Sequence, residues 1–464
     1  MDTTLVAPPP TSRLDPEAVE TLRGQLGGSL LLPQDAGYDD ARRVWNGMID
    51  KRPALIVRPC GAADVQRAVT FAREHDLAVS IKGGGHNVAG HAVSEDGLMI
   101  DLGAMRAVWV DPVARTARVQ GGALWADLDR ETNAFGLATT GGVISSTGVA
   151  GLTLGGGIGW LVGKHGMAID NLLSVDLVTA AGEFVTASVE SHPDLFWALR
   201  GGGGNFGVAT SFEFALHPRG DVLAVLLIYP VEQAREVLAF YREFTETAPE
   251  ELTIYAEIVN DPESGARVIA IGGCWPGDLA EGERVVAPLR AFGPPLLDLS
   301  EVMPYAAWQA AFDAEFPHGR RYYWKANLLR DLTDEVLDAV VEHAADPPLA
   351  TNMIAIEWYR GPMNRIDPAA TAFAHRDARY QLVTVGACDD PAEDETAIAW
   401  ARGLYQATER HALNGGFLNF NNLDGADRRD RVRAGYGANW DRLVEVKRRY
   451  DPGNLFHENN NIAP

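Results

Sequence analysis

The sequence is poor in cysteine, in long apolar runs and in positive charge. Its three cysteines, Cys60, Cys274 and Cys388, have neither metal-ligand spacing nor the pattern of a disulfide framework. We therefore expect no cysteine-bound metal, and the pattern is typical of a protein of the reducing cytoplasm. No stretch approaches the roughly 20 apolar residues that span a bilayer. Lys and Arg number 40 against 63 Asp and Glu, and a net charge of −23 repels nucleic-acid phosphates and anionic lipid. Nucleic-acid and membrane partners are therefore not expected.

The first residues also lack the pattern of an export signal. Residues 1–13 contain three consecutive prolines, but no basic stretch that is followed by an apolar one. We interpret this segment as a loose tail and expect a cytoplasmic protein. The length of 464 residues allows two or three domains with cores of their own.

The predicted secondary structure changes near Pro218. Before it, short strands and turns dominate, with helices predicted over residues 62–77 and 124–134. After it, long strands alternate with amphipathic helices. The predicted strands are 222–229, 252–259, 268–273, 321–328, 353–359 and 380–387, and the predicted helices are 231–247, 333–344 and 395–413. This pattern predicts an α+β fold with an antiparallel sheet that helices cover on one face.

Glycine, by contrast, is abundant, at 48 of 464 residues. It is concentrated in three loops, at residues 82–87, 139–157 and 200–207. Consecutive glycines permit positive φ and let backbone N–H groups approach an anion such as a pyrophosphate. A single glycine triplet is equally consistent with a tight turn that binds nothing. Three such loops in one half of the chain indicate an extended nucleotide ligand.

A nicotinamide-binding fingerprint is the first alternative. It requires G-x-G-x-x-G between a strand and a helix. The glycine run at residues 155–159 fails because Trp160 stands where the last glycine is needed. Gly202, Gly204 and Gly207 have the right spacing, but they precede a predicted strand instead of a helix. The NAD dehydrogenase alternative is therefore weak.

Four separated motifs carry a resemblance. They are Lys-Gly-Gly-Gly-His-Asn at residues 82–87, the glycine-rich residues 148–157, Asp-Leu-Phe-Trp-Ala-Leu-Arg and the following glycines at 194–207, and Tyr-Asp-Pro-Gly-Asn-Leu-Phe at 450–456. In this order they resemble the FAD-linked oxidases of the berberine-bridge type, which have the PCMH (vanillyl-alcohol-oxidase) FAD fold. The resemblance extends from about Pro53 to the end of the chain.

The resemblance implies an FAD domain in two parts with a substrate domain between them. We place a tail and first helix at residues 1–40, the PCMH-type FAD-binding domain at 41–218, the substrate-binding domain at 219–415, and a returning C-terminal segment at 416–464.

The resemblance also implies covalent FAD. His86 would bond to the flavin 8α-methyl group, which raises the flavin potential and retains the cofactor. Members with two attachments carry Cys where this chain has Ile144, so we expect attachment through His86 only. Further residues implied to contact FAD are Lys82, Gly83, Gly84, Gly85, Asn87, Ile144, Ser146, Thr147, Gly148, Gly151, Leu152, Gly155, Gly156, Gly207, Val208, Asn459 and Asn461.

The general base is missing from its usual place. Many family members have a catalytic Tyr in Tyr-x-Asn-Tyr, whereas residues 417–420 read Phe-Leu-Asn-Phe, and a phenyl ring exchanges no proton. On one predicted strand, alternation places Glu357 and Tyr359 on the same face, where apolar surroundings would raise the pKa of Glu357 toward neutrality. A structural carboxylate is the alternative for Glu357. Lys325 and Tyr255 are further candidates for the proton transfer.

Thr147 stands where family oxidases carry a small residue that admits dioxygen, and its hydroxyl could hydrogen-bond a flavin–oxygen adduct. The leading prediction is an FAD-dependent oxidase that takes a hydride from a small alcohol or activated C–H, with dioxygen as acceptor, in secondary metabolism. An oxygenating flavoenzyme on the same fold and a non-catalytic flavin-binding protein are the alternatives. Substrate identity and oligomeric state do not follow from the sequence.

Overall fold

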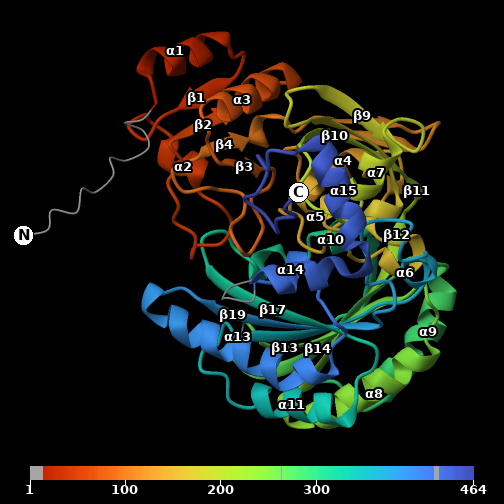
Figure 1. The fold of residues 1–464 in the computed structure, drawn as a ribbon. Helices are drawn as coiled ribbons and strands as arrows, with labels where there is room; N and C mark the ends of the chain where they lie inside the picture. Colours follow the sequence, from red (N-terminus) through yellow and green to blue (C-terminus); the bar gives the residue numbers. More distant parts are fainter. Residues whose placement is uncertain (1–13, 263, 423–427) are drawn as a thin grey trace, which may run out of the picture.

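A computed structural model describes residues 14–262, 264–422 and 428–464. Figure 1 shows the N-terminal sheets and their helices above a large sheet, with a layer of helices below that sheet. Within the described residues, no helix is both long enough and apolar enough to cross a membrane.

Two sheets of the first half carry the glycine loops. The first has the strand order β1-β2-β4-β3, in which β2 and β3 are parallel to β4 and β1 is antiparallel to β2. The second is antiparallel, with the order β5-β6-β10-β8-β9. Their strands are β1 (Ser29–Leu31), β2 (Leu55–Arg58), β3 (Val79–Lys82), β4 (Leu98–Asp101), β5 (Val108–Asp111), β6 (Thr116–Gln120), β8 (Leu172–Val178), β9 (Phe184–Ser188) and β10 (Val208–Ala215).

Short helices cover these sheets. Helix α3 follows the predicted apolar spacing, and its Val65 and Val69 are fully buried against the first sheet. The strand that follows α3 ends at Lys82, directly before the first glycine loop. The helices of this half are α1 (Pro16–Gln25), α2 (Tyr38–Arg42), α3 (Ala62–Glu74), α4 (Trp125–Asn133), α5 (Val149–Leu154), α6 (Val162–His165) and α7 (Pro193–Leu199), and β7 (Leu137–Ala138) pairs with β11 (His217–Pro218).

The second half is built on one large antiparallel sheet, with the order β15-β12-β14-β13-β18-β19-β17 and with β16 also paired to β12. Tyr255 on β13 lies directly opposite Glu357 on β18 in the ladder. The strands are β12 (Asp221–Pro230), β13 (Thr253–Asn260), β14 (Arg267–Trp275), β15 (Leu297–Asp298), β16 (Glu301–Pro304), β17 (Arg321–Leu329), β18 (Met353–Trp358) and β19 (Tyr380–Cys388).

Helices cover the outer face of this sheet, as Figure 1 shows for α8, α9, α11 and α13. Tyr241 of α8, Val336 of α11 and Leu404 of α13 are buried in one core with the strands. The predicted antiparallel sheet with helices on one face is therefore confirmed. The helices after Pro218 are α8 (Ala234–Thr247), α9 (Leu279–Ala291), α10 (Tyr305–Gln309), α11 (Asp334–Ala344), α12 (Pro362–Arg365), α13 (Asp394–Thr408), α14 (Arg428–Tyr436) and α15 (Trp440–Tyr450).

The C-terminal segment returns to the first half of the chain. Helix α15 lies against α7, where Arg449 donates to the Asp194 carboxylate at 2.8 Å. In Figure 1 this segment, in blue, lies among the yellow and orange elements of the N-terminal half. Segments far apart in the sequence therefore meet beside the glycine loops.

Candidate active site

A cavity of about 300 Å³ is lined by the glycine loops, by the inner face of the large sheet and by the C-terminal segment. Most of the predicted site residues line it. They are Gly83, Gly84, Gly85, His86, Asn87, Ile144, Thr147, Gly148, Gly151, Leu152, Gly155, Gly207, Tyr255, Glu357 and Asn459.

The loops that line the cavity fit an extended nucleotide. Gly84 and Gly148 bring two loops into backbone contact, because a Cβ on Gly84 would lie 2.4 Å from the Gly148 nitrogen. Gly151 and Gly204 instead face open space, with nothing within 4 Å of such a Cβ. These bare backbone segments can lie close to a diphosphate, as FAD requires.

The C-terminal asparagines support the same fit. The side-chain oxygens of Asn459 and Asn461 are buried and have no hydrogen-bond partner among the described residues. Buried polar atoms are normally satisfied, so these oxygens point to a polar ligand. Asn459 and Asn460 both line the cavity. The residues present therefore fit the FAD that the sequence predicts.

Five residues predicted to contact FAD do not line the cavity. Lys82 is turned away, because its ammonium group donates to the Ala41 carbonyl at 2.6 Å and pairs with Asp101 at 3.6 Å. The side chain of Val208 is fully buried in the core beside the first sheet. The others are Ser146, Gly156 and Asn461.

His86 is a partly buried side chain of the first glycine loop. Its imidazole stacks on the Trp45 indole, with ring centroids 4.2 Å apart and planes 16° apart. Burial lowers the pKa of His86 to about 3, so the ring is neutral over the working pH range. Its Nε2 has no hydrogen-bond partner among the described residues.

Glu357 is the acidic side chain that the inner face of the sheet presents to the cavity. The Tyr359 hydroxyl and the Gln381 amide, the latter at 3.0 Å, both donate to its Oε2. The pKa of Glu357 is raised to about 8, mainly by burial and also by the charge of Glu257 on the neighbouring strand, against the lowering effect of the two donors. The group can therefore exchange a proton near neutral pH.

Two of the predicted catalytic residues do not reach the cavity. Lys325 lies on the helix-covered face of β17, because the alternation of the strand places Trp324 on the cavity side. Its buried ammonium group donates to the Asn422 carbonyl and lies over the rings of Tyr323 and Tyr405, at 5.4 and 5.5 Å. The assignment of Lys325 as a proton carrier at this cavity is therefore wrong. Tyr359 does not line the cavity either, and its hydroxyl donates to Glu357, which does.

Aromatic rings form the wall beside Glu357. Trp324 and Phe420 lie 5.9 Å apart between ring centroids, and Phe417 lies 5.2 Å from Phe420. Phe373 completes this wall, 5.0 Å from Phe417. Sequence reasoning missed Trp324 and Phe373 as site residues, because a single aromatic residue in a strand or loop has no motif around it.

The acidic side chains that line the cavity have no basic counterpart in the described lining, although Glu458 pairs with Lys51 outside it at 3.8 Å. No Lys or Arg occurs among the described residues that line the cavity, whereas Glu357 and Glu458 do. The lining imidazoles, His86 and His91, have pKa values lowered by burial to about 3 and about 4, so they carry no positive charge at neutral pH. In the described part of the chain, no group of three or more His, Cys, Asp or Glu side chains is placed to hold a metal ion.

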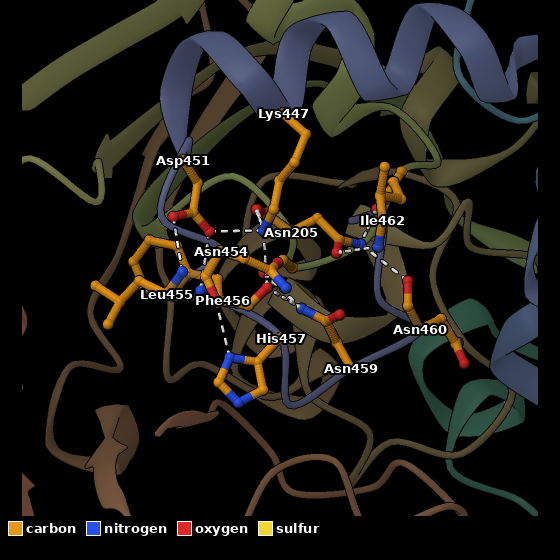
Figure 2. Close-up of polar contacts among 12 residues, drawn as sticks. Asn205, Lys447, Asp451, Asn454, Leu455, Phe456, His457, Asn459, Asn460 and Ile462 are labelled. Carbon is orange, nitrogen blue, oxygen red and sulfur yellow. Dashed lines mark hydrogen bonds and ion pairs between the residues drawn. The ribbon is translucent and has the colours of Figure 1, made fainter. Parts of the chain in front are cut away.

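A buried ion pair fixes the C-terminal segment against the third glycine loop (Figure 2). The Lys447 ammonium donates to Asp451 at 2.6 Å, to the Asn205 carbonyl at 2.8 Å and to the Phe456 carbonyl at 2.9 Å. Asp451 in turn accepts the backbone N–H groups of Leu455 and Phe456. Both charged side chains are fully buried. This contact holds the turn that leads to the cavity-lining asparagines.

Two family models match the chain. Residues 53–188 match a family described as "FAD binding domain", and residues 416–463 match one described as "Berberine and berberine like". The first match contains the loops around His86 and Gly148, and the second contains the ion pair of Lys447 and the lining asparagines.

Similar proteins cover nearly the whole chain. An FAD-linked oxidoreductase of Dictyostelium discoideum is 31% identical over 92% of this chain and 92% of its own length. The (R)-6-hydroxynicotine oxidase of Paenarthrobacter nicotinovorans is 31% identical over 94% of this chain and 97% of its own. Among solved structures, 6-hydroxy-D-nicotine oxidase from Arthrobacter nicotinovorans superimposes with a TM-score of 0.84 at 30% identity, covering 95% of this chain and 98% of that one.

Proposed function

The chain belongs to the berberine-bridge-enzyme-like family of FAD-linked oxidases, and on that premise we propose that it oxidises a small organic substrate at an alcohol carbon or an activated C–H bond, with dioxygen as acceptor. FAD, when bound, supplies the hydride acceptor and passes the electron pair to dioxygen, which gives hydrogen peroxide. The observation that carries the proposal is the position of Glu357, a buried carboxyl on the wall that faces the glycine loops.

Glu357 is the proposed general base. Loss of a hydride from carbon requires that the neighbouring O–H, N–H or C–H proton also leave, and a positioned carboxylate can take it. The Tyr359 and Gln381 donors hold the carboxyl in one orientation and stabilise its charged form. Tyr255, whose buried hydroxyl has no hydrogen-bond partner among the described residues, lies opposite in the ladder and is proposed to orient the substrate.

The walls set the substrate class. Trp324, Phe417 and Phe420 present aromatic faces, which favour a substrate with an apolar or aromatic body. Because basic side chains are absent from the described lining, an anionic substrate would have no counter-ion there, so we propose a neutral or cationic substrate. One relative is named for 6-hydroxynicotine, and a heteroaromatic substrate of that general kind suits this cavity.

His86 is the proposed point of covalent FAD attachment. Its ring is neutral, as a nitrogen nucleophile must be, and it is part of the cavity wall. Ile144 also lines the cavity and offers no nucleophile, so a second attachment at that position is not proposed. A role in cytoplasmic secondary metabolism stays a prediction of the sequence.

Oxygen transfer into the product is the second candidate function. Thr147 lines the cavity with a hydroxyl-bearing side chain, next to the loop of Gly148. Appearance of labelled oxygen from dioxygen in the product would favour this second function over simple oxidation.

The first test of the base is Glu357→Gln in the FAD-loaded enzyme. The amide keeps the shape of the side chain but cannot take a proton, so kcat should fall by about 10²–10⁴-fold, the usual contribution of a general base. The measurement is peroxide production on a substrate found by screening neutral and cationic aromatic compounds.

Glu257→Gln is the matched control for this test. It removes a carboxyl of the adjacent strand that is not part of the cavity wall, and it should retain turnover within a few-fold of wild type. A Glu357→Gln enzyme with bound FAD and wild-type kcat would show that another group is the base.

A further inference from the structure

Trp45 lies in a stack of three rings beside the first glycine loop. Its indole is fully buried between the His86 imidazole and the Tyr322 phenol. The centroid distances are 4.2 Å to His86 and 3.9 Å to Tyr322, and the planes differ by 16° and 8°. Trp45 is not part of the cavity wall, and the proposed reaction gives it no role.

The segment around Trp45 fixes the indole in place. The Trp45 backbone N–H donates to the Gly85 carbonyl at 3.0 Å, and its own carbonyl accepts the Gly319 N–H at 2.9 Å. The indole N–H donates to the Phe316 carbonyl at 3.0 Å. The ring plane is therefore held by one contact from the glycine loop and by two from the segment that leads into β17.

The next residue strengthens the same connection. The Asn46 amide donates to the Val88 carbonyl at 2.7 Å and to the Tyr322 carbonyl at 2.8 Å, and its oxygen accepts the Tyr322 N–H at 2.9 Å. The loop that carries His86 is thereby tied to β17 on both sides of the stack. A residue so held can act as a fixed surface for its neighbour.

His86 has no other side chain to orient it. No hydrogen bond from the described residues reaches its Nε2. The second ring near it, His318, approaches edge-on at 6.4 Å between centroids. Apart from a hydrogen bond to the backbone of His86 itself, the flat contact with Trp45 is thus the interaction that constrains the plane of the imidazole.

We propose that Trp45 is a positioning residue for covalent attachment of FAD, holding the imidazole of His86 in the plane from which a ring nitrogen reaches the flavin 8α carbon. This inference rests on the proposed attachment at His86. In the step, an N–C bond forms, one methyl C–H and one imidazole N–H bond break, and the flavin keeps the two electrons and two protons. Dioxygen, the acceptor in the proposed reaction, then removes them as hydrogen peroxide.

The test compares Trp45→Leu with Trp45→Phe, both produced with ample FAD. Attachment should slow by about 10²-fold in Trp45→Leu, the cost typical of a reacting group held out of position. Trp45→Phe keeps a stacking ring and should restore most of the attachment. The readouts are total FAD per protein and the fraction that stays with the polypeptide after acid precipitation.

The matched control is Trp400→Leu. Trp400 also stacks on a histidine, His343, at 4.8 Å and 27°, and neither residue lines the cavity. This variant loses comparable buried packing and should keep the wild-type acid-stable fraction. A Trp45→Leu protein with bound FAD but little acid-stable FAD, beside an unaffected control, supports the positioning role.

Four outcomes would overturn the inference, and they fall into two distinguishable groups. Wild-type attachment in Trp45→Leu, or equal losses in Trp400→Leu, removes the role of Trp45 and leaves His86 as the attachment point. Release of all flavin from acid-precipitated wild type, or retention of colour by His86→Ala, removes the proposed attachment and the role of Trp45 with it. Peroxide production by the wild type with loosely bound FAD would still leave the oxidase proposal standing.

The pH profile of attachment adds a readout that responds to water reaching His86, and the packing lost at a distance in Trp400→Leu would not change it. Attachment needs a neutral imidazole, and burial holds the pKa of His86 near 3, with His318 and, through it, Lys82 as the titratable groups nearby. If Trp45→Leu admits water, the pKa of His86 rises toward its ordinary value of about 6.5. Attachment should then decline below about pH 6 in the variant but not in wild type.

Discussion

Glu357 is a buried and His86 a partly buried titratable side chain, and their removal from water moves their pKa values in opposite directions. The carboxyl is raised to about 8 and the imidazole is lowered to about 3, because burial disfavours whichever form is charged. At neutral pH both groups are therefore mostly uncharged. The carboxyl of Glu357 loses its proton as the pH rises, whereas the imidazole of His86 stays neutral throughout.

Tyr359→Phe should shift the pH dependence of kcat/KM to higher pH. The Tyr359 hydroxyl donates to the Glu357 carboxylate and lowers its pKa, so without it the pKa rises above about 8. Because the deprotonated carboxylate is the active form, the rise of kcat/KM with pH then begins later.

The control for this shift is Tyr241→Phe. Tyr241 is equally buried in the same domain, but its hydroxyl donates to the backbone carbonyls of Ile254 and Ile356. It should change stability without moving the midpoint. An unmoved midpoint in Tyr359→Phe would mean that Glu357 does not control the profile.

At the scale of elements, helix α15 and the turn that follows it depend on one ion pair. Lys447 and Asp451 are fully buried, and each also satisfies backbone groups of the turn or of Asn205. Breaking a buried pair by removing one partner leaves the other charge uncompensated.

Asp451→Ala should therefore lower the free energy of unfolding by about 3–5 kcal/mol. The double variant Lys447→Met with Asp451→Leu removes both charges and should recover part of this loss. Thermal and denaturant unfolding of the FAD-loaded protein measure both effects. A double variant less stable than Asp451→Ala would contradict the view that the unpaired lysine is the main cost.

The sequence predicted the long elements of the large sheet well, because their periodicity is strong. Helices α8, α11 and α13 and the strands beside them lie within a few residues of the predicted bounds, apart from the C-terminal end of α13. Helix α9 was missed because Pro288 lies inside it. The error at Lys325 has another cause: a strand pattern shows which residues share a face, but not which face lines the cavity. Trp45 gave no signal, since its partners are 41 and 277 residues away in the sequence.

The whole molecule carries a net charge of −23, and the described lining of the cavity has carboxyl side chains, Glu357 and Glu458, but no Lys or Arg that could pair with an anion. Surface and interior therefore both disfavour an incoming anion. The preference against anions therefore belongs to the molecule as a whole and does not depend on one residue.

Small aromatic probes of different charge test this preference. Benzylamine should perturb the visible spectrum of the bound flavin at a concentration at least about tenfold lower than benzoate, a difference of about 1.4 kcal/mol. Benzyl alcohol should fall between them. Titration of the FAD-loaded protein with each probe is the measurement, and stronger binding of benzoate would contradict the proposed substrate class.

The return of the C-terminal segment also affects when the site is completed during synthesis of the chain. Lys447 and the Asn205 carbonyl that it binds are 242 residues apart, so a ribosome that adds about 5–20 residues per second completes this contact roughly 12–48 s after the loop emerges. During that interval the glycine loops lack the asparagines that complete their wall. We therefore expect the chain to bind FAD only after translation is complete, because until then the site lacks part of its wall.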